Sequence, residues 1–287
     1  DINKVIQMQD VKNLPLLMIA VDAGKSNLAT LLLNQPKIRV NLQDKQGTTA
    51  LIIAAHHGNL DIVDKLLEKA GIDVNVRDKE AWTALHWAVS QKQLTIVYAL
   101  LKKDSIDVNL KNKDGATALM FAAENGHQAI ADALLKTDGI DVNLQKNDGE
   151  TALTMAVERG HQGVVDLLLK KDGIDINLGN DFMSTPLMFA AANGHQGIVD
   201  ALLKKEGIDI NRQNKYDATA LMFAVEKGHR LVVDSLLKKE GIDINVQDKD
   251  GVTALHRAVM KGNKQILQAL LDNDADFSIE NDKKKTA

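Results

Sequence analysis

Histidine is the residue type whose spacing in this sequence most directly invites a chemical role. Four histidines follow a glycine and recur every 34 residues, at His127, His161, His195 and His229. A zinc site needs several ligands that converge on one ion. Residues one unit apart on a repeating array lie too far apart to converge in this way. We therefore interpret these histidines as structural hydrogen-bonding groups, with a metal ladder as the disfavoured alternative.

Other arrangements that could carry chemistry are weak. His56 and His57 are adjacent, and adjacent positions on a helix point in different directions, so we do not predict a metal site there. The chain has no cysteine, which excludes disulfides and thiolate metal sites. No glycine-rich phosphate loop, Ser-His-Asp set or paired-carboxylate cleft can be assembled. We predict no catalytic residues, no metal and no cofactor.

The elements that hold these residues belong to a repeat. A Thr-Ala-Leu or Thr-Pro-Leu core recurs every 34 residues, and an eighth copy begins at Pro15 without the threonine. The seven threonines are Thr49, Thr83, Thr117, Thr151, Thr185, Thr219 and Thr253. A fixed period of roughly 20–50 residues is the signature of a solenoid or similar array.

Each unit is expected to contain two short helices. In the unit that begins at Asp114-Gly115, a turn signal comes first and Thr117 can cap the first helix. Gly126 can end this helix in the left-handed conformation. The second helix carries a buried Leu134-Leu135 pair. Helices of about ten residues are unstable alone in water, so neighbouring units must bury these leucines.

These motifs, spaced in phase, resemble the ankyrin repeat. They are Thr-Ala/Pro-Leu, Ala-Ala, Gly-His, Leu-Leu and Asp-Val-Asn, over roughly residues 10–287. The period departs from the family's usual 33 residues by one. The resemblance implies an all-α solenoid of stacked antiparallel helix pairs with projecting loops. We predict a capping segment at 1–13 and one continuous array of eight repeats at 14–287.

The resemblance also implies a scaffold that binds another protein and has no catalytic chemistry. In the family, partners contact the loop tips and the exposed face of the first helix. The matching positions that we predict to bind a partner are Lys45, Gln46, His56, His57, Lys79, Glu80, Trp82, Ser90, Gln91, Asp181, Phe182, Lys215, Tyr216, Glu226 and Lys227.

Three units break the repeat at the loop tip, where the turn glycine is replaced. Ala81, Met183 and Asp217 stand in its place, and the aromatic residues at loop tips occur in these same units. They are Trp82, Phe182 and Tyr216. Exposed aromatic side chains are favoured binding anchors, so we predict that these three are substantially exposed and hold the partner. The alternative is drift in exposed loops.

A second aromatic set occupies one position of the first helix, beside the buried alanines. It consists of Trp87, Phe121, Phe189 and Phe223. We predict that these rings fill the core.

Three asparagines resemble substrates of an animal asparaginyl hydroxylase, because each follows a leucine at the spacing found in ankyrin substrates. They are Asn75, Asn109 and Asn143. We expect hydroxylation if the protein meets animal cytosol, and we favour a loop-holding role as the reason that these residues are present.

Composition supports a protein-binding scaffold. A net charge of −4 argues against a nucleic-acid partner, and no apolar run is long enough for membrane insertion. We predict a cytoplasmic monomer. Two alternatives remain open: a targeting or regulatory segment of a larger enzyme or channel, and a secreted effector that acts on host proteins in the host cytosol.

Overall fold

The computed structural model describes residues 16–287, and these residues form two compact units. The described part of the first unit contains residues 16–122 and 127–141. The second unit contains residues 123–126 and 142–287. The capping segment expected at residues 1–13 lies outside the described residues, and a single continuous array stays a prediction.

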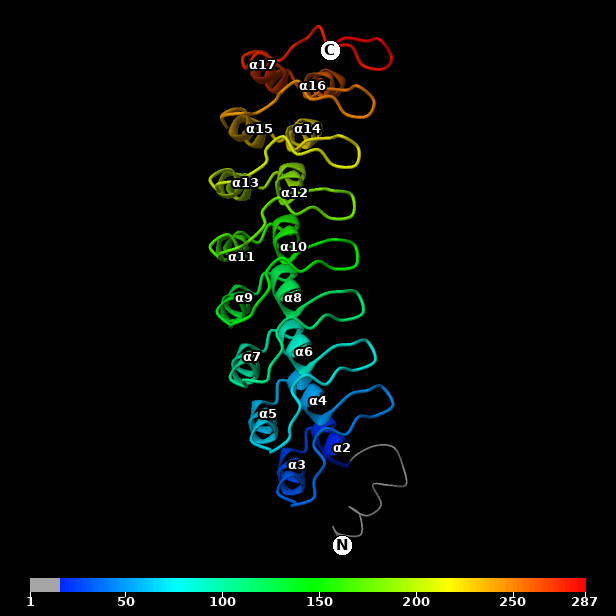
Figure 1. Ribbon diagram of the computed structural model, residues 1–287, viewed down its shortest axis with the longest axis vertical. Helices are drawn as coiled ribbons and strands as arrows, with labels where there is room; N and C mark the ends of the chain where they lie inside the picture. The colour runs from blue at the N-terminus through cyan, green and yellow to red at the C-terminus, as the bar shows by residue number, and fades with distance from the viewer. Residues whose placement is uncertain (1–15) are drawn as a thin grey trace. The chain divides into compact units, whose positions relative to one another are not determined.

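The first unit is built from short helices in pairs (Figure 1). In chain order they are α2 (Leu16–Asp22), α3 (Ser26–Leu33), α4 (Ala50–His57), α5 (Leu60–Leu67), α6 (Ala84–Ser90), α7 (Leu94–Leu101), α8 (Ala118–Glu124) and α9 (Gln128–Leu135). The last two residues of α8 are assigned to the second unit. The even-numbered helix of each pair is called the first helix, and the odd-numbered helix is called the second helix.

The second unit repeats the same arrangement. Its helices are α10 (Ala152–Glu158), α11 (Gln162–Leu168), α12 (Pro186–Asn193), α13 (Gln196–Leu203), α14 (Ala220–Lys227), α15 (Arg230–Leu237), α16 (Ala254–Lys261) and α17 (Lys264–Leu271). No strand occurs between residues 16 and 287, where the only β pairing is an isolated bridge between Gln145 and Thr151. The predicted all-α class is confirmed.

Helix boundaries follow the capping residues. The side-chain oxygen of Thr49 accepts a hydrogen bond from the backbone N–H of Ile52 at 3.2 Å, which satisfies one amide of the first turn of α4. Thr185 caps α12 in the same way, and Pro186 occupies the first helical position. Gly58 ends α4 in the left-handed conformation at φ 74°. The local sequence therefore sets both ends of these helices.

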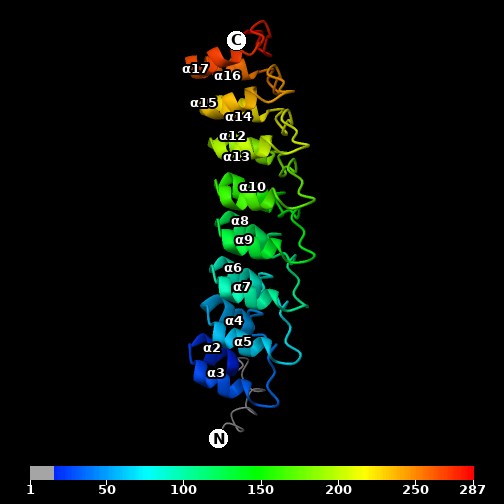
Figure 2. The ribbon, with the colours of Figure 1, turned by 90° about the vertical axis from the view of Figure 1, so that its left-hand side faces the viewer.

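Packing between neighbouring pairs supplies the core. First helices contact first helices, as α4 contacts α6, and second helices contact second helices, as α5 contacts α7 (Figures 1 and 2). The same pattern joins α12 to α14 in the second unit. In most Leu-Leu pairs both side chains lie in this interior, as Leu202 and Leu203 do, whereas Leu101 is half-buried and Leu271 is 39% exposed. Burying a leucine contributes roughly 1.5–3 kcal/mol, which these helices need because they are too short to be stable alone.

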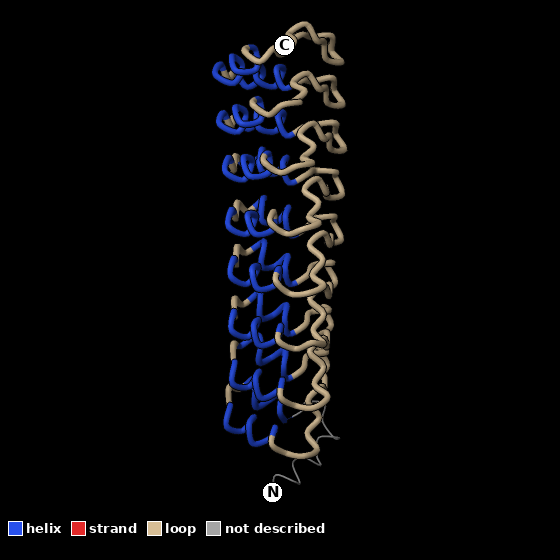
Figure 3. Tube along the Cα trace, turned by 60° about the vertical axis from the view of Figure 1, so that its left-hand side comes forward, coloured by secondary structure: helices blue, strands red, loops and turns tan. Residues whose placement is uncertain are grey.

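Loops lie on one side of the helices within each unit (Figure 3). Each ends in a hairpin-like tip, where a backbone N–H of one tip donates to a carbonyl of the tip before it. The N–H of Lys215 donates to the carbonyl of Phe182 at 2.8 Å, and that of Lys249 to the carbonyl of Tyr216 at 3.2 Å. These bonds fix the spacing of neighbouring tips.

Candidate functional site

The tips that carry Phe182 and Tyr216 are held by asparagine side chains. Oδ1 of Asn180 accepts hydrogen bonds from the backbone N–H groups of Phe182 and Ser184, at 3.0 and 3.1 Å. Oδ1 of Asn214, a buried residue, accepts from Tyr216 and Ala218, at 2.9 and 3.1 Å. The backbone of each tip is thus fixed from inside, and the aromatic side chains are left to project outward.

The turn position keeps a positive φ angle where its glycine is replaced. Ala81, Met183 and Asp217 have φ angles of 60°, 59° and 57°, close to the 77° of Gly47 at the same place. A residue with a side chain is disfavoured there by roughly 1 kcal/mol. These three tips therefore keep the turn in spite of the substitution.

Phe182 and Tyr216 form the most exposed aromatic pair of the second unit, and this pair is called the tip pair. Their relative exposures are 54% and 58%. The rings are parallel to within 15°, with centroids 6.4 Å apart. Met183 beside them is 43% exposed. Three large apolar side chains thus face solvent on two neighbouring tips, and an exposed apolar patch of this kind marks an interaction site.

Trp82 differs from the expectation of a substantially exposed ring. It is half-buried, with ring centroids 4.7 Å from Trp87 and 4.6 Å from Phe121. The ring of His56 meets Trp87 edge-on at 4.8 Å. Trp82 follows the turn residue Ala81, at the place of Ser184, whereas Phe182 precedes the turn residue Met183. The two aromatic side chains therefore leave their tips from different positions.

The predicted core role of the first-helix rings is wrong in part. Trp87, Phe121, Phe189 and Phe223 are all only half-buried, whereas the alanines that follow them are fully buried. The hydrophobicity of these residues could not show that their position is half-exposed. The fixed place of this position in the repeat is the signal that could have shown it.

The remaining predicted contact residues lie mostly at the surface. The exposed ones are Lys45, Gln46, His56, His57, Lys79, Glu80, Gln91, Asp181, Lys215 and Lys227. Ser90 and Glu226 are half-buried. The structure brings them together only as neighbours along the tips and first helices of each unit, and no single cleft gathers them.

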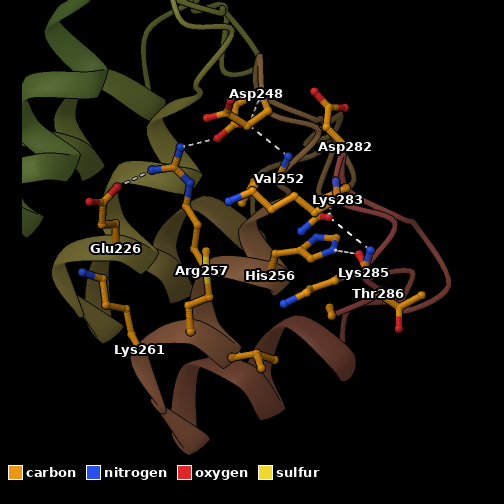
Figure 4. A pocket seen from close by; sticks show the side chains of 15 residues that line it. Glu226, Asp248, Val252, His256, Arg257, Lys261, Asp282, Lys283, Lys285 and Thr286 are labelled. Atoms are coloured by element: carbon orange, nitrogen blue, oxygen red, sulfur yellow. Dashed lines mark hydrogen bonds and ion pairs between the residues drawn. The ribbon is translucent and has the colours of Figure 1, made fainter.

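Glu226 lies at the edge of a cavity of about 780 Å³ on the face of α16 (Figure 4). Arg257 projects from α16 and makes ion pairs with Glu226 and with Asp248, the latter at 2.6 Å. Nε2 of His256 donates to the carbonyl of Lys285 at 3.0 Å. These contacts tie the tip residues to α16, so we assign Arg257 a structural role.

The glycine-following histidines join neighbouring repeats, as predicted. Nε2 of His161 donates to the carbonyl of Glu124 at 2.9 Å, and Nε2 of His229 donates to that of Ala192 at 3.1 Å. The ring of His229 lies over Gly194, where an added Cβ would come within 2.6 Å of it. The Gly-His motif therefore needs glycine both for its positive φ and for this close approach.

The asparagines of the connecting segments also join neighbouring repeats. The amide nitrogen of Asn109 donates to the carbonyl of Gly139 at 2.7 Å, and its oxygen accepts from the N–H of Asp141 at 2.9 Å. Asn75 makes the same pair of bonds to Ser105 and Asp107. Asn143 donates likewise to Gly173 and accepts from Asp175. Both ends of each amide are used, which supports the loop-holding interpretation.

One buried histidine has a strongly shifted pKa. His86 is 2% exposed, and burial lowers its pKa from 6.5 to about 4, against a smaller raising effect of its hydrogen bond to the carbonyl of Ala116. Nδ1 lies 2.9 Å from the hydroxyl of Thr83 and completes the cap of α6. The neutral ring is thus part of the fold, with no solvent access for catalysis.

Comparison with protein families identifies the repeat. The model described as ankyrin repeats (3 copies) matches residues 17–112, 105–180 and 173–248, and the model described as ankyrin repeats (many copies) matches 228–271. The chain belongs to the ankyrin-repeat family. Comparison with curated proteins gives no match. Ankyrin repeats are generally protein–protein interaction modules and typically have no catalytic role.

Within residues 16–287, no three histidine, aspartate or glutamate side chains are grouped so that they could hold a metal ion. None of the helices in the same range has the length and apolar character needed to cross a membrane.

Proposed function

We propose that this ankyrin-repeat protein binds another protein through its loop tips and the half-exposed face of its first helices, with the tip pair as the central contact in the second unit. The supporting observation is the exposure of Phe182 and Tyr216, parallel to one another on neighbouring tips. Aromatic side chains are enriched at binding hot spots because they bury a large area at a small cost in conformational entropy.

The charged and polar tip residues form the rim of this surface. Asp181 and Lys215 flank the tip pair, and Lys227 is exposed at the end of α14. Rim charges contribute mainly to the rate of association and to specificity. We expect substitutions of these residues to change association more than dissociation.

A second contact is proposed in the first unit, around the half-exposed rings of Trp82, Trp87 and Phe121. Their mutual contacts and the neighbouring His56 give a continuous aromatic surface there. Lys45, Gln46, Lys79, Glu80, His57, Ser90 and Gln91 lie on the same tips and first helices. Because Trp82 packs against other rings, removing it would also alter folding, so the tip pair gives the cleaner test.

The test compares Phe182→Ala and Tyr216→Ala with a matched control. Tyr98→Ala removes an aromatic ring of 47% exposure from a second helix, away from the tips. A partner would first be captured from lysate, and its affinity for each purified variant would then be measured by calorimetry. We expect Phe182→Ala and Tyr216→Ala to lose about 2 kcal/mol, roughly thirtyfold, while Tyr98→Ala binds normally. Equal affinity for all three variants would refute the proposal.

Hydroxylation of Asn75, Asn109 and Asn143 is a separate proposal. It is supported by their position on half-exposed connecting segments. Because both ends of each amide are hydrogen-bonded, the enzyme needs a locally opened segment. Intact mass spectra after incubation with the hydroxylase should show added oxygen, and the yield should rise in mild denaturant. Spectra that stay unchanged under both conditions would end the proposal.

A further inference from the structure

We propose that the tip pair binds the guanidinium group of an arginine on the partner, with Asp181 and Asp217 as its counter-ions. This inference rests on the proposed function and assigns the chemistry of the partner at the same site. Three observations support it: the parallel arrangement of the two rings, the lack of described partners for the two carboxylates, and the net negative charge of the two tips.

The two rings form a slot that suits a flat group. They are parallel to within 15°, and their centroids are 6.4 Å apart, at the wide end of the range for aromatic pairs. A planar group in van der Waals contact with a ring on each side needs about 7 Å between the ring planes, and the separation of these planes is no larger than the centroid distance. The two exposed side chains must therefore rotate apart to admit it. Tip-to-tip backbone bonds keep the two rings in register while this happens.

The carboxylates of the two tips have no partner among the described residues. Asp181 directly precedes Phe182, and Asp217 directly follows Tyr216. Neither side chain makes a hydrogen bond or an ion pair with any residue between 16 and 287. Since successive Cα atoms are about 3.8 Å apart, each carboxylate lies within one residue of a ring. Both carboxylates thus belong to the two tips that carry the rings, and the proposal places the cation between a ring face and a carboxylate of the same tips.

The identity of the cation follows from its shape. A guanidinium group is planar, stacks on aromatic faces and offers five N–H donors to carboxylates. A lysine ammonium is compact, strongly hydrated and unable to stack as a plane. An apolar side chain in the slot would desolvate two carboxylates without pairing them, which costs free energy. Arginine is the side chain that satisfies both the rings and the carboxylates.

Lys215 is the opposing charge at this site. It lies on the same tip as Tyr216, is exposed and has no ion pair within the described range. With Asp181 and Asp217 it leaves a net charge of −1 on the two tips. We therefore expect Lys215→Gln to strengthen arginine binding, a gain that a purely apolar contact would not show.

The experiment uses two short peptides as probes, Ac-Gly-Arg-Gly-NH2 and the same peptide with citrulline, which has nearly the same shape but no charge. Binding is followed by the NMR signals of Phe182 and Tyr216 in the full chain. We expect the NMR signals of both rings to shift when the arginine peptide is added. The protein should bind this peptide about fivefold more tightly than the citrulline peptide, which is the effect of one exposed cation–π contact. Equal affinity for both peptides would overturn the inference.

Matched variants locate the effect. The double variant Asp181→Asn with Asp217→Asn should abolish the preference for arginine, and asparagine tolerates the positive φ at position 217. Asp250→Asn, on the next tip, should leave that preference unchanged. If the preference for arginine falls equally in the double variant and in Asp250→Asn, the effect is one of diffuse charge and the proposed site is overturned.

If Phe182→Ala weakens binding of the partner but the wild-type ring signals do not respond to the arginine peptide, the inference fails and the proposed function stands. If the rings respond to arginine but partner affinity is insensitive to their removal, the proposed function fails instead.

Discussion

Replacing His86 by methionine should make the first unit less sensitive to acid. Burial holds the pKa of His86 at about 4, compared with 6.5 in the unfolded chain. Between these values the unfolded chain binds a proton that the folded chain excludes. Stability from this group is therefore complete above pH 6.5 and falls as the pH drops toward 4.

The size of the effect follows from the two pKa values. Each unit of difference between the two pKa values corresponds to about 1.4 kcal/mol of unfolding free energy. The free energy of unfolding should therefore fall by about 3 kcal/mol at low pH, and by roughly 2 kcal/mol already at pH 5. Methionine is the natural replacement, because Met120 holds the same position of the next repeat, buried and 3.4 Å from the backbone N–H of its capping Thr117. The His86→Met variant should keep most of its stability at pH 7.

Tryptophan fluorescence during urea unfolding is a suitable assay. Both tryptophans of the chain, Trp82 and Trp87, adjoin His86, and the Trp82 ring centroid is 5.9 Å from that of His86. The free energy of unfolding would be measured at pH 7 and pH 5 for both proteins. Leu85→Ala is the control, since it lowers stability at both pH values without removing a titrating group. A difference between pH 7 and pH 5 that is the same in His86→Met and in the wild type would refute the reasoning.

Three further predictions concern stability, measured by urea unfolding. Gly194→Ala should cost more than 2 kcal/mol, because its Cβ would clash with His229, whereas Gly207→Ala, with positive φ but open space, should cost only about 1 kcal/mol; equal costs would contradict the close approach. Asp217→Gly should stabilise by about 0.5–1 kcal/mol, because glycine adopts φ 57° without strain, and a loss would argue against that strain. Asn109→Ala should cost about 1–3 kcal/mol by leaving a carbonyl and an N–H of the next repeat unpaired, and a neutral effect would show that water replaces the amide.

The sequence predicted much of the fold because its strongest signals are local. The threonine caps and terminal glycines act within one turn of helix, and the Leu-Leu pairs recur in phase, so the helix pairs could be placed from the repeat. The hydrogen-bonding role of histidines such as His161 could be predicted by excluding a metal site. Its carbonyl partner could not, because that group lies 37 residues earlier in the chain.

The candidate site was harder to predict because its properties depend on contacts between repeats. Phe182 precedes the turn residue of its tip and matches Glu80, whereas Trp82 follows the turn residue of its tip and matches Ser184. The first ring faces solvent, and the second packs against Phe121 of the next repeat. The half-exposure of Phe121 depends on which side of its helix meets the neighbouring pair. Composition and spacing do not contain that orientation, so the core prediction for this position was wrong in part.

The hydrogen bond from Lys215 to the carbonyl of Phe182 has a consequence for how such a protein can change its specificity. The same backbone bond recurs from Lys79 to Gln46, from Asp181 to Asp148 and from Lys249 to Tyr216, although these tips display different side chains. Loss or duplication of one whole repeat by recombination would therefore preserve the backbone pattern and bring different tips together. Removing the repeat of Tyr216 would place Phe182 beside the tip of Lys249 and abolish the tip pair in one genetic step. The recognition surface can thus be rearranged one repeat at a time, and each rearranged protein would keep a packed core.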